Sequence, residues 1–272
     1  MSLNLRFFPK ICLLLGILFF KGLYCDPVAD LKNRGWDFDS LNLLRAIHAE
    51  DVEAIRLFFR AKARFEVRDL EGRTALILAI LKQNIDMTAI ILDAGTNPNQ
   101  TGPEDFSPLM LSALSNQPDI TAMLLVARAD PNLYDQGGVT ALGYAAMAGN
   151  ELSVTALLAT GALVNHRDKS GNSALMYASR TGSLPIVKLL LAEKARLDYR
   201  NNDGMSALMM ATVNQHEEVV AELLLAQADP NLKTGEGFTA LDMACRLKNQ
   251  NLQNLLKKAK ARPSTECQEV AP

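Results

Sequence analysis

Hydrophobic and hydroxyl positions recur along this chain with a period of 33 residues. A Thr or Ser stands at six equally spaced positions, and a leucine follows each of them two positions later. These hydroxyl positions are Thr74, Ser107, Thr140, Ser173, Ser206 and Thr239. Five consecutive steps without an insertion indicate a repeat architecture, in which each unit stacks on the next.

Each unit has the pattern of two helices joined by a turn. In the fourth unit, helical spacing of apolar residues predicts a first helix over 141–148 and a second over 151–160. Thr140 can cap the first helix, and Gly161 can end the second in the left-handed conformation. An extended segment and a turn at 168–171 then lead to the next unit.

The two ends of the repeated region differ from its middle. Lys257 occupies a column that holds leucine in earlier units, and the first unit keeps its apolar register without a Thr or Ser at its start. Terminal repeats need such a polar outer side, since no neighbour covers them. We therefore expect about seven repeats over 39–262, with the first and last as caps, a linker over 26–38 and a flexible tail over 263–272.

The segments Gly138–Leu142 and Ala228–Asn231 resemble the start and the end of the ankyrin repeat. The resemblance covers residues 39–262 and implies an all-α solenoid of helix–turn–helix units with connecting hairpin loops, which serves to bind proteins. One departure from the family is systematic, since its histidine is absent from all six units. The loop hydrogen bonds that this histidine makes in the family are therefore in doubt. Its place is taken by Ile77, Met110, Gly143, Met176, Met209 and Asp242.

The first 25 residues have the pattern of a secretory signal peptide. Arg6 and Lys10 precede an apolar run over 11–20, which is too short to span a bilayer. We expect export from a bacterium to the periplasm or the medium, with no transmembrane span after processing; a retained anchor is the weaker alternative. A lipid on Cys25 is disfavoured, because Tyr24 stands where lipoprotein signals need a small residue.

Composition narrows the function further. The chain is 49% hydrophobic, which is ample for a core, and its formal charge of -2 gives no electrostatic case for nucleic acid binding. The four cysteines are too few for a disulfide framework, so that a Cys245–Cys267 bridge and two free thiols both stay open.

No group of residues suggests catalysis, a cofactor or a metal. His48, His166 and His216 fall in separate repeats, and the loop carboxylates are interpreted as turn formers. Several methionines could form a copper site in an exported protein, but they lie at helical apolar positions where packing explains them. These are Met176, Met209, Met210 and Met243.

The resemblance implies that a partner binds the concave side, formed by hairpin tips and first helices. Aromatic, methionine and arginine side chains, which are enriched in interface cores, fall there by register. The predicted contact residues are Leu70, Arg73, Leu81, Phe106, Leu114, Tyr134, Met147, Arg167, Lys169, Arg180, Arg200, Met205 and Phe238. We expect a monomer that binds a protein with acidic character. The alternatives are a secreted effector that acts on a host protein and a metal-handling accessory protein.

Overall fold

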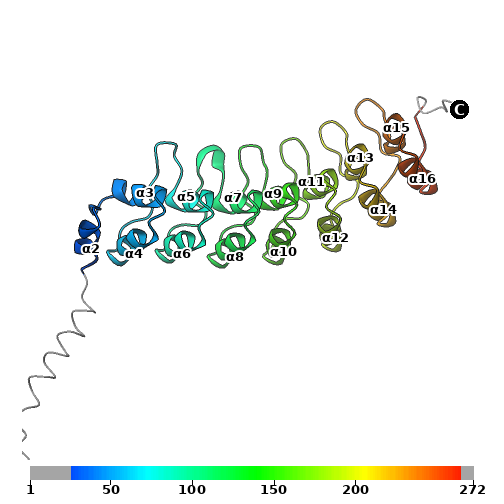
Figure 1. The fold of residues 1–272 in the computed structure, drawn as a ribbon. Helices are drawn as coiled ribbons and strands as arrows, with labels where there is room; N and C mark the ends of the chain where they lie inside the picture. The colour runs from blue at the N-terminus through cyan, green and yellow to red at the C-terminus, as the bar shows by residue number, and fades with distance from the viewer. Residues whose placement is uncertain (1–25, 265–272) are drawn as a thin grey trace, which may run out of the picture.

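The computed structural model describes residues 26–264, which form a curved stack of seven helix pairs (Figure 1). This region holds fifteen α-helices, one short 3-10 helix, η1 (Pro103–Asp105), and no strand. The first helices of the pairs are α3 (Ser40–His48), α5 (Ala75–Leu81), α7 (Pro108–Leu114), α9 (Ala141–Ala148), α11 (Ala174–Thr181), α13 (Ala207–Val213) and α15 (Ala240–Arg246). The second helices are α4 (Val52–Arg60), α6 (Ile85–Asp93), α8 (Pro118–Val126), α10 (Glu151–Ala159), α12 (Leu184–Ala192), α14 (Glu217–Leu225) and α16 (Gln250–Lys258). The expected all-α solenoid is confirmed.

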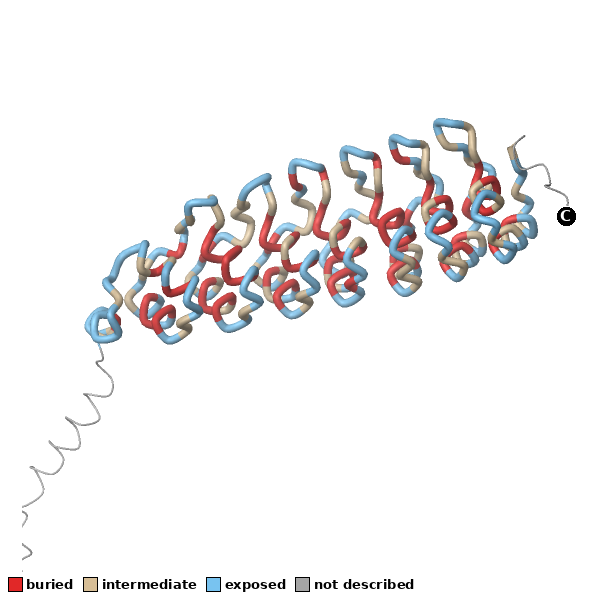
Figure 2. The backbone as a smooth tube through the Cα atoms, turned by 45° about the horizontal axis from the view of Figure 1, so that its top comes forward, coloured by how far each residue is buried: buried red, intermediate tan, exposed pale blue. Residues whose placement is uncertain are grey.

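The helices form two parallel rows. The first helices make one row, the second helices make the other, and the hairpins project beyond the first row on the inside of the bend (Figure 1). Buried residues run along the helices between the rows, whereas most of each hairpin tip is exposed (Figure 2). We call the surface of the first helices and hairpins the inner face, and the surface of the second helices the outer face.

The six hydroxyl residues of the repeat cap the first helices, as predicted. Each side-chain oxygen accepts the backbone N–H three residues later, at 3.2–3.4 Å. Such a cap satisfies one of the donors that a helix start leaves without an intrahelical partner. The 33-residue spacing of Thr and Ser therefore fixes where each first helix begins.

The leucine column lies between neighbouring repeats. Leu142, Leu175 and Leu208 are each 1% exposed, in the first helices α9, α11 and α13. Ala145 and Ala178 are fully buried beside them, and their small side chains allow neighbouring first helices to pack closely. The core is thus continuous along the stack.

A ladder of side-chain amides and carboxylates joins the loops that follow the second helices. At each rung, the oxygen of one loop accepts a backbone N–H of the next loop, at 2.7–2.9 Å. The accepting residues are Asn99, Asn132, Asn165, Asp198 and Asn231. These bonds connect the repeats although the family's histidine is missing.

The segment 26–38, expected as a linker, contains the helix α2 (Pro27–Asn33). Leu31 of α2 is fully buried, and Trp36 Nε1 donates to Asp51 Oδ2 at 3.3 Å. The linker prediction was wrong because one buried leucine in seven residues gives no periodic signal. Asp26 followed by Pro27 is a helix-start signal that the prediction missed.

Asp242 secures the C-terminal cap. Its carboxylate accepts the backbone N–H and hydroxyl of Thr239, both at 2.8 Å, and the N–H of Ser264 at 2.8 Å. Burial raises the pKa of Asp242, but these hydrogen bonds outweigh burial, so that its pKa lies below the usual value. Residues 263 and 264, predicted as tail, are therefore held by the last repeat.

Three sequence predictions concern residues beyond this region. The signal peptide over 1–25, the lipid site at Cys25 and the tail from residue 265 onward lie outside the described residues. Cys245 of α15 is disulfide-bonded. The other cysteines of the chain lie outside the described residues.

The register predicts a specific cost for truncating the leucine column. Leu175→Ala leaves a cavity between repeats, and we expect it to lower the free energy of unfolding by about 2–5 kcal/mol. Urea denaturation measures this, with Leu163→Ala as the control, since Leu163 is 59% exposed. A loss below about 0.5 kcal/mol, the scale of surface sites, would contradict the register.

The carboxylate of Asp242 should stabilise the cap in a pH-dependent way. Because its folded pKa is depressed, its contribution is present above the unfolded pKa of about 3.9 and is lost as the pH falls through the folded pKa. Asp242→Asn should cost about 1–3 kcal/mol at pH 7, since an amide donor then faces other donors. Urea denaturation of both proteins at pH 7 and near pH 3 should show the difference shrinking in acid; a constant difference would contradict it.

Candidate functional site

Backbone hydrogen bonds join successive hairpins of the inner face from Gly137 to Gly235. Lys169 N donates to Gly137 O at 2.9 Å, Asn202 N to Ser170 O at 2.9 Å, and Gly235 N to Asp203 O at 3.1 Å. Gly204 has a φ of +77°, and a Cβ there would lie 2.6 Å from the backbone nitrogen of Gly235. Close backbone approach therefore requires glycine at this position.

Two tyrosines of the first helices brace the hairpins against the stack. Tyr144 donates to Asp135 Oδ2 at 2.5 Å, and Tyr177 donates to Asp168 Oδ2. Burial and these carboxylates raise the pKa of both tyrosines, so that both stay protonated donors. Sequence reasoning missed the pairs, although the Asp–Tyr spacing is nine residues in both.

The C-terminal ends of the first helices present a column on the inner face. Leu81 is 45% exposed and Leu114 is 39% exposed, whereas Met147 is half-buried and Arg180 is exposed. Val213 continues the column with 43% exposure. The structure thus brings four of the predicted contact residues into one line.

The predicted residues just before each helix cap are less exposed than expected. Phe106, Met205 and Phe238 are half-buried, because the hairpin packs against the first helices. Phe106 makes an edge-to-face contact with Tyr144 at 5.0 Å between ring centroids, and Arg246 lies over Phe238 at 3.8 Å. Only part of each side chain is available to a partner.

Two predicted residues lie fully on the hairpins. Leu70 is completely exposed at its tip. Tyr134 is 59% exposed and stacks on His166 at 5.8 Å between centroids. His166 Nε2 also contacts Gly138 O at 2.8 Å, so that the ring beneath Tyr134 is fixed. Tyr134 is therefore an exposed aromatic side chain that is held in place by its neighbour.

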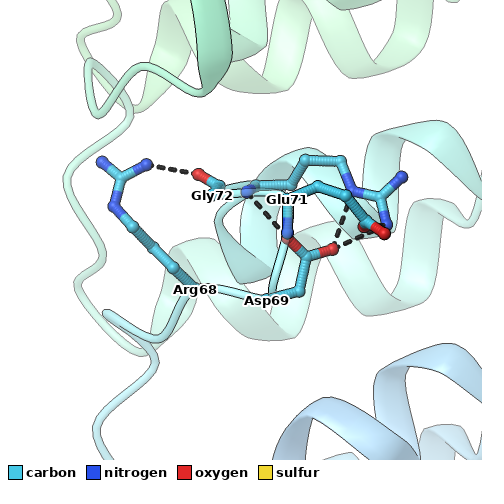
Figure 3. A network of polar contacts seen from close by, with 5 residues as sticks. Arg68, Asp69, Glu71 and Gly72 are labelled. Carbon is cyan, nitrogen blue, oxygen red and sulfur yellow. Dashed lines mark hydrogen bonds and ion pairs between the residues drawn. The ribbon is translucent and has the colours of Figure 1, made fainter.

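Arg73 is partly occupied within its own hairpin. It forms ion pairs with Asp69 and Glu71, and the hydrogen bond to Asp69 is the main cause of its raised pKa. Figure 3 shows Arg68 extending in the other direction, where its guanidinium donates to Gly72 O at 2.6 Å. These contacts stabilise the turn and reduce what Arg73 offers to a partner.

The predicted basic residues divide into two kinds. Arg167 donates to Arg200 O at 2.7 Å, and Arg200 donates to Lys233 O at 3.1 Å, so that each links its hairpin to the next. Lys169 is exposed, and Arg180 is exposed over the ring of Tyr177 at 5.2 Å. All four residues are positively charged. Of their side chains, those of Lys169 and Arg180 form no hydrogen bond between hairpins among the contacts described above.

Tyr199 strengthens this basic region, and sequence reasoning missed it. The guanidinium carbons of Arg167 and Arg196 lie 5.1 and 5.4 Å from its ring centroid. Cation–π contacts of this kind hold guanidinium groups in place. The region therefore presents ordered positive charge.

The histidines and methionines considered above for catalysis or metal binding have structural roles. His216 Nε2 contacts Arg180 O at 3.0 Å, and Met176 and Met209 are at most 2% exposed. A cavity beside His166 and Asp168 has a volume of about 10 Å³, which leaves no room for a substrate.

Residues 26–264 lack two features. No three His, Cys, Asp or Glu side chains gather there closely enough to hold a metal ion. No helix in that part of the chain has the length and apolar character needed to cross a membrane.

Comparison with known proteins agrees with this geometry. No curated protein matches the chain. A family model described as ankyrin repeats (3 copies) matches residues 43–135, 109–201 and 193–267. These matches cover most of the sequence, and so the chain belongs to the ankyrin repeat family.

Proposed function

We propose that this chain is an exported, non-catalytic scaffold that binds a protein partner on its inner face. Ankyrin repeats generally mediate protein–protein interaction, and the family is typically non-catalytic. The observation that carries the proposal is the exposed aliphatic column at Leu81 and Leu114, on the same face as the hairpins that backbone hydrogen bonds join. A preorganised surface loses little conformational entropy on binding, which favours affinity.

The two halves of the inner face differ in the predicted contact residues that they expose. Its N-terminal half is apolar at Leu81 and Leu114, whereas its C-terminal half carries Lys169 and Arg180. A partner that fits this surface has an apolar segment followed by an acidic one. Apolar contact supplies affinity, and complementary charge supplies register and a faster encounter.

Export is part of the proposal and rests on residues 1–25. The basic, then apolar pattern there is that of a signal peptide. A secreted effector of the same fold would instead accumulate in the medium or in host cells.

Co-purification after crosslinking in the native cells tests the scaffold and its location together. We expect a protein partner in the periplasmic fraction, and we expect its recovery to fall at least about tenfold with Leu81→Glu, Leu114→Glu and Tyr134→Ala combined. These side chains are exposed, and so the variant should fold, as circular dichroism would verify.

The control is Leu225→Glu, which changes a leucine that is 76% exposed on the outer face. Equal recovery of the partner by the wild type and the inner-face variant would reject the inner face as the site. Recovery of the chain from the medium alone would favour the effector.

Charge reversal tests the acidic character of the partner. Lys169→Glu with Arg180→Glu should slow association about tenfold at low salt, and the difference should narrow near 0.5 M salt because ions screen exposed charges. Surface plasmon resonance measures the rates. Lys258→Glu, on the outer row, should leave them unchanged; the same rates for all three proteins would rule out an acidic contact here.

A further inference from the structure

The outer face carries fewer charges in the middle of the stack, where Glu151 is the one charged exposed residue of α10. In α4, the exposed side chains are charged at Glu53, Arg56 and Arg60. In α10, the corresponding exposed residues are Leu152, Thr155 and Ala159. A helix on the surface of a folded protein normally turns polar residues to the solvent.

The neighbouring helices extend this uncharged area. Val126 at the end of α8 is 85% exposed, and Leu152 at the start of α10 is 68% exposed. We call the area the outer patch. Its exposed residues are Ala122 and Val126 of α8, Leu152, Thr155 and Ala159 of α10, and Ala192 of α12. Exposed apolar side chains on neighbouring helices are a feature of interaction sites.

We propose that the outer patch is the contact surface between two copies of this chain. The helices α6, α8, α10, α12 and α14 contain no aromatic residue. Interfaces with unrelated proteins usually depend on Trp, Tyr or Arg anchors, whereas homodimer interfaces are more aliphatic and less charged. Small side chains such as Ala122 and Ala159 allow helices of two copies to approach closely.

Charge at the edges of the outer patch fits a second copy and disfavours a membrane. Asp119 of α8 and Lys188 of α12 lie on the helices that flank α10, at the repeat positions of Leu152 and Thr155, and both are exposed. A two-fold axis parallel to α10 would place α8 of one copy over α12 of the other, so that these charges face each other twice. Lys188 is 3.7 Å from Glu222, yet its side chain remains 56% exposed.

Carboxylates on the same face oppose anionic lipid. Asp86, Asp93, Asp119 and Glu151 are all exposed in α6, α8 and α10. Binding to a membrane surface depends on Lys or Arg and on aromatic side chains, which these three helices lack.

The size of the outer patch sets the strength of the contact. Each second helix is nine residues, or about 13 Å, long, and adjacent helices lie about 10 Å apart. Three helices therefore offer about 400 Å² per copy, or about 800 Å² in total, which is below the range of stable dimers. We expect a reversible dimer with a dissociation constant of tens of micromolar.

Such a dimer would turn the two inner faces outward. The helices α8, α10 and α12 lie on the outside of the bend, opposite the hairpins (Figure 1). Each dimer would then present two inner faces, which increases the avidity for a partner that has several copies of its binding segment. The dimer itself does not depend on the proposed partner.

Analytical ultracentrifugation of the processed wild-type chain over about 1–200 µM tests the dimer. We expect the mass to rise from one chain toward two, and Leu152→Glu to weaken self-association at least about tenfold. Glu is well tolerated near a helix start, and so this variant should keep its fold. The control Leu225→Glu changes an exposed leucine of α14 outside the outer patch and should dimerise normally.

Exchanging the charges of Asp119 and Lys188 tests the proposed two-fold arrangement of the dimer. Asp119→Lys and Lys188→Asp should each weaken the dimer, and the double variant should restore it. A wild type that stays monomeric at 200 µM, unchanged association of Leu152→Glu, an equal loss with Leu225→Glu, or a double variant without recovery would each overturn the proposal. Binding of the wild type, but not of Leu152→Glu, to phosphatidylcholine–phosphatidylglycerol vesicles would assign the outer patch to a membrane instead.

Discussion

The burial of the leucine column between neighbouring helix pairs is the interaction on which the rest of the molecule depends. A single pair of helices of seven to nine residues cannot cover its own apolar side. Leu142, Leu175 and Leu208 are each 1% exposed in the stacked structure. Stability is therefore shared between neighbours, and the two terminal units must end the stack with polar surfaces.

Hydrogen bonding follows from this packing. Once the helices are stacked, the loops and hairpins of successive repeats lie close enough for Asn132 and Asn165 to bond across them. From the second repeat onward, successive repeats are thus joined by a side-chain amide or carboxylate, although the family's histidine is absent. Asp242 plays a related part at the last repeat, where its carboxylate holds residue 264.

The two faces of the stack are free for different tasks because the core lies between them. The inner face carries ordered aromatic and basic groups, and several of its arginines are also structural. Arg167 and Arg200, for example, bond to backbone carbonyls of the next hairpin. The outer face has few charges at its centre, and a solenoid that needs only its neighbours for stability can use this surface for self-association.

The sequence by itself determined the repeat length and the starts of the first helices, because these depend on local patterns such as the caps at Thr140 and Ser173. It also placed Leu81 and Leu114 on one face, since register is preserved without insertions. The sequence did not reveal that Phe106 is half-buried on Tyr144, that Tyr177 bonds to Asp168, or that α2 covers the first repeat. Only the tertiary structure decided these contacts, because each depends on the distance between segments and not on periodicity along the chain.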